Sequence, residues 1–233
     1  MKFAIIAAGE GSRLASEGIK SPKPLIKIQG VPIIERLVKI FERAGASSIS
    51  IVINSKQPDT ERQLRNLQCN CPVNIVIKDT PSSMHSMHAL APHLRGEEKF
   101  CLTTVDTLFR EEDFAQYIEQ LAASDNDGVM AVTPYIDDEK PLYVETDGEL
   151  RITAFSDTLC NDCKYISGGI YGLSPKALDT LERCIERGES RMRNFQRALI
   201  ADGLTLRACP IDKIIDIDHA GDIEKAEIFL AQK

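Results

Sequence analysis

In the first half of the chain, short apolar runs alternate with longer stretches in which apolar residues recur every three or four positions. Short apolar runs are typical of buried β-strands, and the longer period is typical of amphipathic helices. Regular alternation of the two predicts an α/β fold with a mostly parallel central sheet and helices on both of its faces. The predicted strands are 2–8, 49–53, 73–77, 99–105 and 128–133, and the predicted helices are 33–45, 60–67, 85–94 and 111–123.

The second half of the chain has a less regular pattern. Apolar alternation on either side of Asp147-Gly148, a pair that favours tight turns, predicts a β-hairpin over 141–152. No linker rich in Pro, Gly and Ser interrupts the chain and no internal repeat occurs, so the sequence predicts a single domain over 1–233 with a small β lobe in its second half. The other predicted elements are strands 166–172, 204–210 and 213–217, and helices 175–187, 191–202 and 220–231.

The composition is that of an ordinary soluble globular protein, with 43% hydrophobic and 27% charged residues. No apolar run approaches the roughly 18 residues that a membrane helix needs, and the N-terminus lacks a signal-peptide pattern. We therefore expect a cytoplasmic protein without a membrane partner. A net charge of −7 disfavours nucleic-acid binding. Residues 1–27 nevertheless carry five basic and two acidic side chains, and this local excess suits a small polyanion.

The cysteines predict reduced thiols. Their number, seven, is odd, and the chain is not a small disulfide-rich scaffold. Cys69-x-Cys71 and Cys160-x-x-Cys163 suggest a metal site, but the pairs lie about ninety residues apart and match no usual zinc spacing. The sequence leaves zinc binding open and favours the interpretation without zinc.

A glycine-rich loop follows the first apolar run, residues 3–8, and reads Gly9-Glu10-Gly11-Ser12-Arg13. A loop of this kind places backbone N–H groups at the carboxyl edge of a sheet, where anions bind. Arg13 and Lys23 supply charges that match phosphate oxygens. The dinucleotide fingerprint is excluded because Leu14 replaces its third glycine, and the Walker pattern is excluded because the chain contains no Gly-Lys pair.

Three linked segments resemble the N-terminal signature of the nucleotidyltransferases, the sugar-1-phosphate and alcohol-phosphate pyrophosphorylases. Residues 7–14 match A-A-G-x-G-S/T-R-L, residues 22–25 match P-K-P-L, and residues 30–34 match G-x-P-I/M-I/L. The resemblance implies a Rossmann-like three-layer α/β/α fold, in which about 1–135 bind the nucleotide and about 136–233 bind the acceptor. It implies Arg13 and Lys23 as catalytic residues and a nucleotide site formed by Ala7, Ala8, Gly9, Gly11, Ser12, Arg13 and Lys23.

Asp106 ends the apolar run 99–105, so we expect it at the same sheet edge as the glycine loop. A carboxylate beside phosphates is repulsive unless a cation lies between them, and Mg²⁺ is the expected ion. The family has a metal-binding Asp at this strand end, and residues 215–223 resemble its second metal-binding segment. Within that segment Asp218 is the first choice of ligand and Asp216 the second. In the alternative interpretation Asp106 caps helix 111–123 or begins a turn, and one of Asp216 and Asp218 caps the C-terminal helix.

The base and acceptor sites are less sharply defined. Ser86 lies in the segment that corresponds to the family's base-binding turn, whose form here is closer to cytidylyltransferases for alcohol phosphates. The pair Gly168-Gly169 resembles the acceptor-side strand, although a tight bend alone would also explain it. Lys164 is the candidate for holding the acceptor phosphate, because the Glu-Lys-Pro tripeptide of many sugar-specific relatives is missing from this place.

The resemblance implies Mg²⁺-dependent transfer of a nucleoside monophosphate from an NTP to a phosphorylated acceptor, with release of pyrophosphate. The acceptor is a sugar-1-phosphate or an alcohol phosphate such as phosphocholine. A non-catalytic regulatory or scaffold subunit of the same fold is the alternative, and an NAD-linked enzyme is disfavoured by Leu14. The sequence leaves open the nucleobase, the acceptor and the oligomeric state, with a homo-oligomer among the alternatives.

Overall fold

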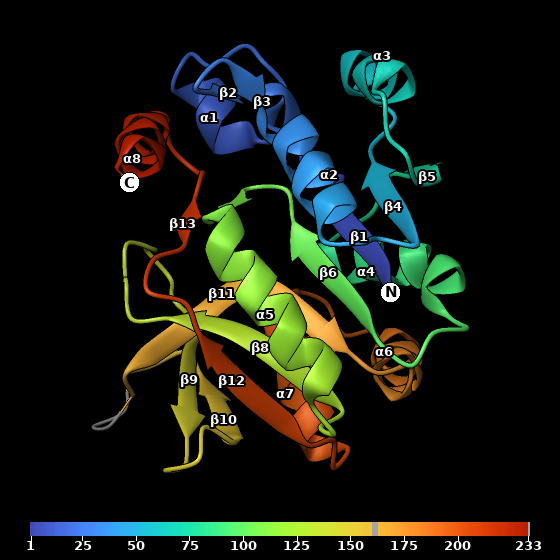
Figure 1. Ribbon diagram of the computed structural model, residues 1–233, viewed down its shortest axis with the longest axis vertical. Helices are drawn as coiled ribbons and strands as arrows, with labels where there is room; N and C mark the ends of the chain where they lie inside the picture. Colours follow the sequence, from blue (N-terminus) through green and yellow to red (C-terminus); the bar gives the residue numbers. More distant parts are fainter. Residues whose placement is uncertain (160–162, 233) are drawn as a thin grey trace.

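The computed structural model describes residues 1–159 and 163–232. Four parallel strands form one half of its main sheet, in the order β5, β4, β1, β6 (Figure 1). Most of their residues are apolar, which suits strands that are covered on both faces. They confirm four predicted strands, and their bounds are β1 (Lys2–Ala7), β4 (Ser48–Ile53), β5 (Val73–Ile77) and β6 (Phe100–Thr104).

The long strand β11 joins this half of the sheet to the other half. It runs antiparallel to β6 on one side and to β8 on the other, and β8 pairs in parallel with β12. The first residues of β11 also pair with the hairpin β9–β10, which is the predicted small β lobe. Strands from both halves of the chain therefore share one sheet. These strands are β8 (Gly128–Thr133), β9 (Tyr143–Thr146), β10 (Ile152–Ser156), β11 (Tyr165–Leu173) and β12 (Leu206–Pro210).

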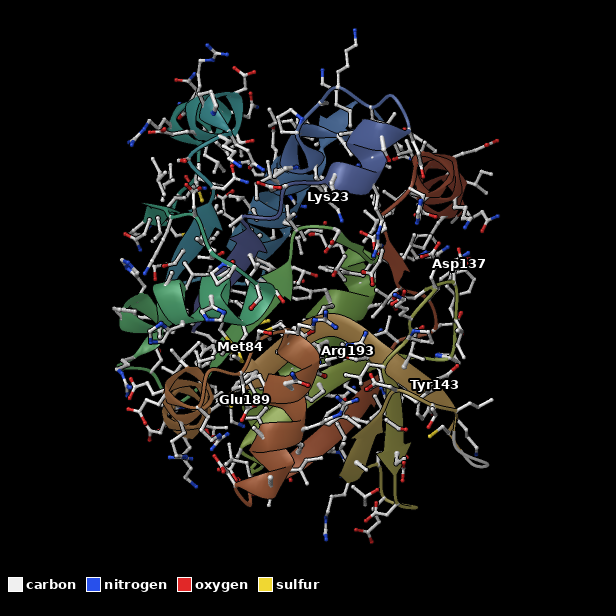
Figure 2. The ribbon with its side chains drawn as sticks, turned by 180° about the vertical axis from the view of Figure 1, so that it is seen from behind. Lys23, Met84, Asp137, Tyr143, Glu189 and Arg193 are labelled. Carbon is white, nitrogen blue, oxygen red and sulfur yellow. The ribbon has the colours of Figure 1, made fainter. Side chains whose placement is uncertain are left out.

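Helices cover both faces of the sheet, as the alternating pattern predicts. Apolar side chains of α2, α3 and α5 pack on one face, and those of α4, α6 and α7 pack on the other. Figure 1 shows α2 and α5 in front of the strands, and the opposite view in Figure 2 brings α4, α6 and α7 forward. The three-layer α/β/α prediction is confirmed. The helices are α2 (Ile33–Arg43), α3 (Pro58–Asn66), α4 (Ser83–Leu94), α5 (Glu111–Ala123), α6 (Lys176–Glu186) and α7 (Met192–Ala201).

A third apolar cluster brings the N-terminal segment against the last helix, α8 (Figure 1). Several short elements in this region were not predicted from the sequence. None is longer than five residues, and a hydrophobic period cannot be recognised over so short a stretch. The unpredicted elements are α1 (Ser12–Ser16), the 3₁₀ helix η1 (Lys23–Leu25), β2 (Lys27–Ile28), β3 (Val31–Pro32) and β7 (Thr107–Leu108). In contrast, β13 (Ile215–Asp216) and α8 (Ala220–Ala231) confirm the predicted strand 213–217 and helix 220–231.

The structure corrects the expectation that the cysteines are all reduced, because Cys163 is disulfide-bonded. Cys160 lies outside the described residues, so the zinc hypothesis for its pair is not tested there. In the described part of the chain, Cys69, Cys71, Cys101, Cys184 and Cys209 are free. None of the helices within 1–159 and 163–232 combines the length and apolar character that crossing a membrane requires.

Candidate active site

The glycine loop leaves the carboxyl end of β1 in a shape that depends on Gly11. Gly11 has a φ of 63°, in the left-handed region that favours glycine. A Cβ atom at this position would lie 3.3 Å from Cβ of Lys23. Gly11 therefore allows both the turn into α1 and the close approach of the Lys23 side chain.

We expect Gly11→Ala to lower the free energy of unfolding by about 1–3 kcal/mol, because alanine is strained at positive φ. Gly9→Ala is the matched control, since Gly9 is not at positive φ and no neighbouring atom lies within 4 Å of a Cβ placed there. Urea denaturation of the two variants measures the difference. Equal stabilities would contradict this account of the loop.

Two side chains that we did not single out from the sequence brace the same loop. Asn54 donates from Nδ2 to the carbonyl oxygen of Ala8 at 3.0 Å, and Gln57 donates from Nε2 to that of Gly9 at 3.0 Å. Both residues are buried, so water does not compete for these bonds. A polar residue directly after an apolar run is the sequence signal for Asn54, which follows the predicted strand 49–53.

The loop forms one wall of a cavity of about 480 Å³ at the carboxyl edge of the sheet. Nine predicted site residues line it, whereas Ala7 is buried within β1 and does not. Thr80, Pro81, Ser82, Ser83 and Thr104 complete much of the remaining wall. The predicted residues in the lining are Ala8, Gly9, Gly11, Ser12, Arg13, Lys23, Ser86, Asp106 and Asp218.

Charged side chains from distant parts of the chain meet at this cavity. Nζ of Lys23 lies 2.6 Å from Oδ2 of Asp106 and 2.6 Å from Oδ1 of Asp218. Arg13 donates from its guanidinium to the other oxygen of Asp218 at 2.8 Å. Figure 2 shows Lys23 beneath the N-terminal segment, toward the centre of the molecule. The two predicted catalytic cations therefore contact the two first-choice metal ligands directly.

The opposite charges of Lys23 and its carboxylate partners shift the pKa values of these side chains. Burial by itself would lower the pKa of Lys23, but Asp106 and Asp218 outweigh that effect and raise it. Burial would likewise raise the pKa of Asp106, and Lys23 reverses this so that the pKa is lowered. Lys23 is therefore an ammonium and Asp106 a carboxylate at neutral pH.

Asp216 lies apart from the Lys23 contacts. Desolvation of its carboxyl group, together with repulsion from Asp106 and Asp218, raises its pKa to about 7, although the residue as a whole is exposed. Oγ1 of Thr107 donates to its Oδ1 at 3.3 Å. Asp216 lines a neighbouring hollow instead of the main cavity.

None of these three carboxylates caps a helix, although Asp106 lies in the turn between β6 and β7. The N-cap of α5 is Arg110, four residues beyond Asp106. The N-cap of α8 is His219, which forms a capping box with Asp222. Asp106 and Asp218 instead present their oxygens to Lys23.

The donor set at this place suits a hard divalent cation. Oδ2 of Asp106 and Oδ1 of Asp218 both contact the ammonium group of Lys23. The two oxygens are therefore separated by no more than the sum of their distances to that nitrogen. Within 1–159 and 163–232, no group of three or more His, Cys, Asp and Glu side chains is arranged to hold a metal ion. Mg²⁺ needs fewer, since proteins bind it through one or two carboxylates together with substrate phosphates and water.

Hydroxyl groups dominate the wall around the start of α4. The Oγ1 of Thr80 and the Oγ of Ser86 are hydrogen-bonded at 2.6 Å, and Ser86 is buried. Ser82 Oγ accepts the backbone N–H of Arg191 at 3.2 Å, which ties this wall to the start of α7. Figure 2 shows α4 and α7 side by side, with Met84 and Arg193 on the two helices. The place of Ser86 in the wall is compatible with the predicted nucleotide contact.

The predicted acceptor residues are not gathered around the main cavity. A Cβ atom at Gly168 would lie 2.4 Å from Cδ1 of Ile214, and one at Gly169 would lie 2.5 Å from Oγ1 of Thr107. Atoms of the protein make the close approach to this glycine pair. Gly169 has a φ of 74° and the register of β11 shifts between Ser167 and Tyr171, as the interpretation of a bend requires. Lys164 is exposed just before β11. The acceptor role of these three residues stays a prediction.

A small hollow of about 40 Å³ adjoins the main cavity and shares Arg13 and Asp218 with it. Acidic side chains predominate in its lining, and several of them come from the loop that follows β8. Asp137, one of these, is labelled in Figure 2. The acidic residues of this hollow are Asp137, Asp138, Glu139, Asp216, Asp218 and Asp222.

A family model described as a MobA-like NTP transferase domain matches residues 3–202. The bifunctional IPC transferase and DIPP synthase of Archaeoglobus fulgidus is 31% identical over 239 residues, which cover 97% of this chain and 43% of that protein. The glucose-1-phosphate cytidylyltransferase of Salmonella typhi is 23% identical over 205 residues, which cover 78% of each chain. The chain spans about half the length of several curated relatives, between 50% and 59% of three of them.

Solved structures support the fold. The inositol-1-phosphate CTP transferase from T. maritima superposes with a TM-score of 0.80 at 18% identity, over 99% of this chain and 96% of that chain. Such a match at low identity establishes a common architecture, and the chemistry of the site has to be argued from its residues.

Proposed function

We propose that this chain, which belongs to the family of MobA-like NTP transferase domains, transfers a nucleoside monophosphate from an NTP to a phosphorylated acceptor and releases pyrophosphate. One observation carries the proposal. Lys23 and Arg13 converge on Asp106 and Asp218 in the lining of a cavity walled by the glycine loop. Cations for a triphosphate and carboxylates for a metal ion are thus combined in one place.

In this proposal the protein acts by positioning and by electrostatic stabilisation. The second pKa of a phosphomonoester is about 6, so the acceptor phosphate is already mostly dianionic at pH 7 and needs no general base. Arg13 and Lys23 would hold the triphosphate and neutralise the charge that develops on the leaving pyrophosphate. The braced backbone of residues 8–11 would hold its phosphates in a fixed orientation.

We propose Asp106 and Asp218 as the residues that hold Mg²⁺, with Asp216 as the second choice to Asp218. Their fit rests on the shared contact with Lys23, which keeps one oxygen of each carboxylate near a common cation. A bound Mg²⁺ would screen the acceptor phosphate from the α-phosphate.

For the acceptor we propose a sugar phosphate or an alcohol phosphate. The names of related proteins include acceptors of both kinds, glucose-1-phosphate and inositol-1-phosphate. The acidic lining of the adjoining hollow adds a reason to test alcohol phosphates that carry a positive charge, such as phosphocholine.

The proposal is tested by measuring pyrophosphate release with each of the four NTPs against sugar-1-phosphates, inositol-1-phosphate and phosphocholine. We expect one combination to react in the presence of Mg²⁺ and to stop when EDTA is added. Absence of turnover in every combination, together with NTP binding measured by calorimetry, would favour the regulatory or scaffold subunit instead.

Arg13→Ala is expected to reduce this turnover by about a hundredfold, because a donor aimed at developing charge contributes that much in comparable sites. Arg13 is half exposed, so its loss should leave the fold intact. Arg151→Ala, which removes an exposed arginine of the β-hairpin, is the matched control. Near-normal turnover in Arg13→Ala would contradict the role of this residue.

A further inference from the structure

Two cysteines on the outer side of the sheet lie close enough to react with one another. The Sγ atoms of Cys69 and Cys71 are 3.5 Å apart, and both residues are partly exposed. Cys101, Cys184 and Cys209 are buried, so they are shielded from reagents in solution. The pair lies between the end of α3 and the start of β5, the edge strand of the sheet.

The segment that carries these thiols is held by its neighbours. Glu42 of α2 accepts the backbone N–H of Asn70, the residue between the two cysteines. Lys39 of the same helix donates to the carbonyl oxygen of Gln68. On the other side, the backbone N–H of Ile49 donates to the carbonyl oxygen of Pro72 at 2.9 Å. The two thiols are therefore brought together by contacts on both sides of the turn.

A metal site does not explain the pair, because no group of three or more ligands assembles anywhere in the part of the chain that the structure describes. A disulfide bond has an S–S length of about 2.04 Å, so the sulfur atoms need to approach by about 1.5 Å. Side-chain rotation can supply much of that distance. A hollow of about 340 Å³ beside the thiols, lined by apolar residues and Arg65, admits a small reagent.

We propose that Cys69 and Cys71 form a redox-active dithiol that closes reversibly to an intramolecular disulfide by exchange with a low-molecular-weight disulfide such as oxidised glutathione. One cysteine thiolate attacks the reagent, forming a mixed disulfide and releasing one thiolate. The second cysteine thiolate then attacks the protein sulfur of the mixed disulfide and releases the second. The dithiol loses two electrons and two protons, and the reagent is reduced to two thiols.

The rate of this exchange depends on how much of the cysteine thiol is deprotonated. The pKa of Cys71 is raised to about 11, mainly by burial and secondly by the hydrogen bond with Cys69. The thiol is therefore mainly protonated at pH 7, and the rate of disulfide formation should increase as the pH rises toward that value.

The sequence offers a direct readout, since trypsin releases residues 66–78 as a peptide that contains both thiols and no other cysteine. The reduced protein is equilibrated at pH 8 in glutathione buffers of stepped redox ratio, quenched with acid, alkylated and digested. We expect the wild-type peptide to be two hydrogens lighter and to carry no alkyl label. At equilibrium, the ratio of dithiol to disulfide should depend on the square of the reduced glutathione concentration.

Cys69→Ser and Cys71→Ser are the matched variants. Each should form only a mixed disulfide with glutathione. Its ratio of thiol to mixed disulfide should depend on the first power of the reduced glutathione concentration. A wild-type peptide that keeps both labels in the most oxidising buffer, carries glutathione, or links two chains overturns the proposal. The same titration in urea tests the role of the fold, and an equal disulfide equilibrium in folded and unfolded protein would contradict the positioning described here.

Discussion

Replacing Asp106 with asparagine is expected to lower the rate of pyrophosphate release by at least about a hundredfold, because we propose that this carboxylate holds the cation that neutralises transition-state charge. Asparagine keeps the shape of the side chain but lacks its charge. Lys23 retains Asp218 as a partner in this variant, so the fold should survive. Steady-state kinetics at saturating Mg²⁺ and NTP measure the loss, and circular dichroism checks the fold.

Asp125→Asn is the matched control, because Asp125 is an exposed aspartate beyond the C-terminal end of α5. Its turnover should equal that of the wild type. If Asp106→Asn retained more than a small fraction of wild-type activity, the cation would have to be held elsewhere, and the proposed pairing of Asp106 with Asp218 would be wrong.

The main layers of the fold could be predicted from the sequence because burial on both faces leaves a simple pattern. The runs that became β1, β4 and β6 are mostly apolar, and the apolar residues give way to Gly9, Asn54 and Asp106. β7 left no such pattern, since it has only two residues and is formed by pairing with β13. Pairing between distant segments is invisible to a local period.

The residues of the candidate site also divide into those that could be predicted from the sequence and those that could not. Arg13 and Asp106 each follow an apolar run, so their common edge could be predicted from strand direction alone. Asp218 is more than a hundred residues from Asp106 in sequence, and the resemblance to a family was needed to connect them. The loop brace by Asn54 and Gln57 depends on hydrogen bonds that only the folded chain reveals. The acceptor residues stay predictions, because Gly168 and Gly169 are approached by atoms of the protein itself and Lys164 does not line the main cavity.

The contact of Lys23 with two carboxylates bears on the order in which a metal ion and a nucleotide bind at the site. The Lys23 ammonium lies between Asp106 and Asp218, the position that a cation shared by the two carboxylates would need. Its side chain is only 10% exposed, so water screens these contacts weakly. A metal ion entering without nucleotide therefore competes with Lys23 for the same oxygens. A triphosphate would remove this competition by offering Lys23 and Arg13 other partners.

Lys23→Met is accordingly expected to have two opposite effects. Turnover should fall by about a hundredfold, because a cation aimed at the triphosphate is lost. Affinity for Mn²⁺ in the absence of nucleotide should rise by about tenfold, because two carboxylates are left without their shared cation. Arg13→Met should raise this affinity less, since the Arg13 side chain is 53% exposed and its pair with Asp218 is screened by water.

Electron paramagnetic resonance of free Mn²⁺ measures the affinity directly and does not depend on catalysis. Lys20→Met controls for the loss of one positive charge from the same segment, because Lys20 is exposed. If Lys20→Met raised the affinity as much as Lys23→Met, a general change in surface potential would account for both. An unchanged or weaker affinity in a folded Lys23→Met variant would mean that Asp106 and Asp218 do not form the cation site, whatever that variant's turnover.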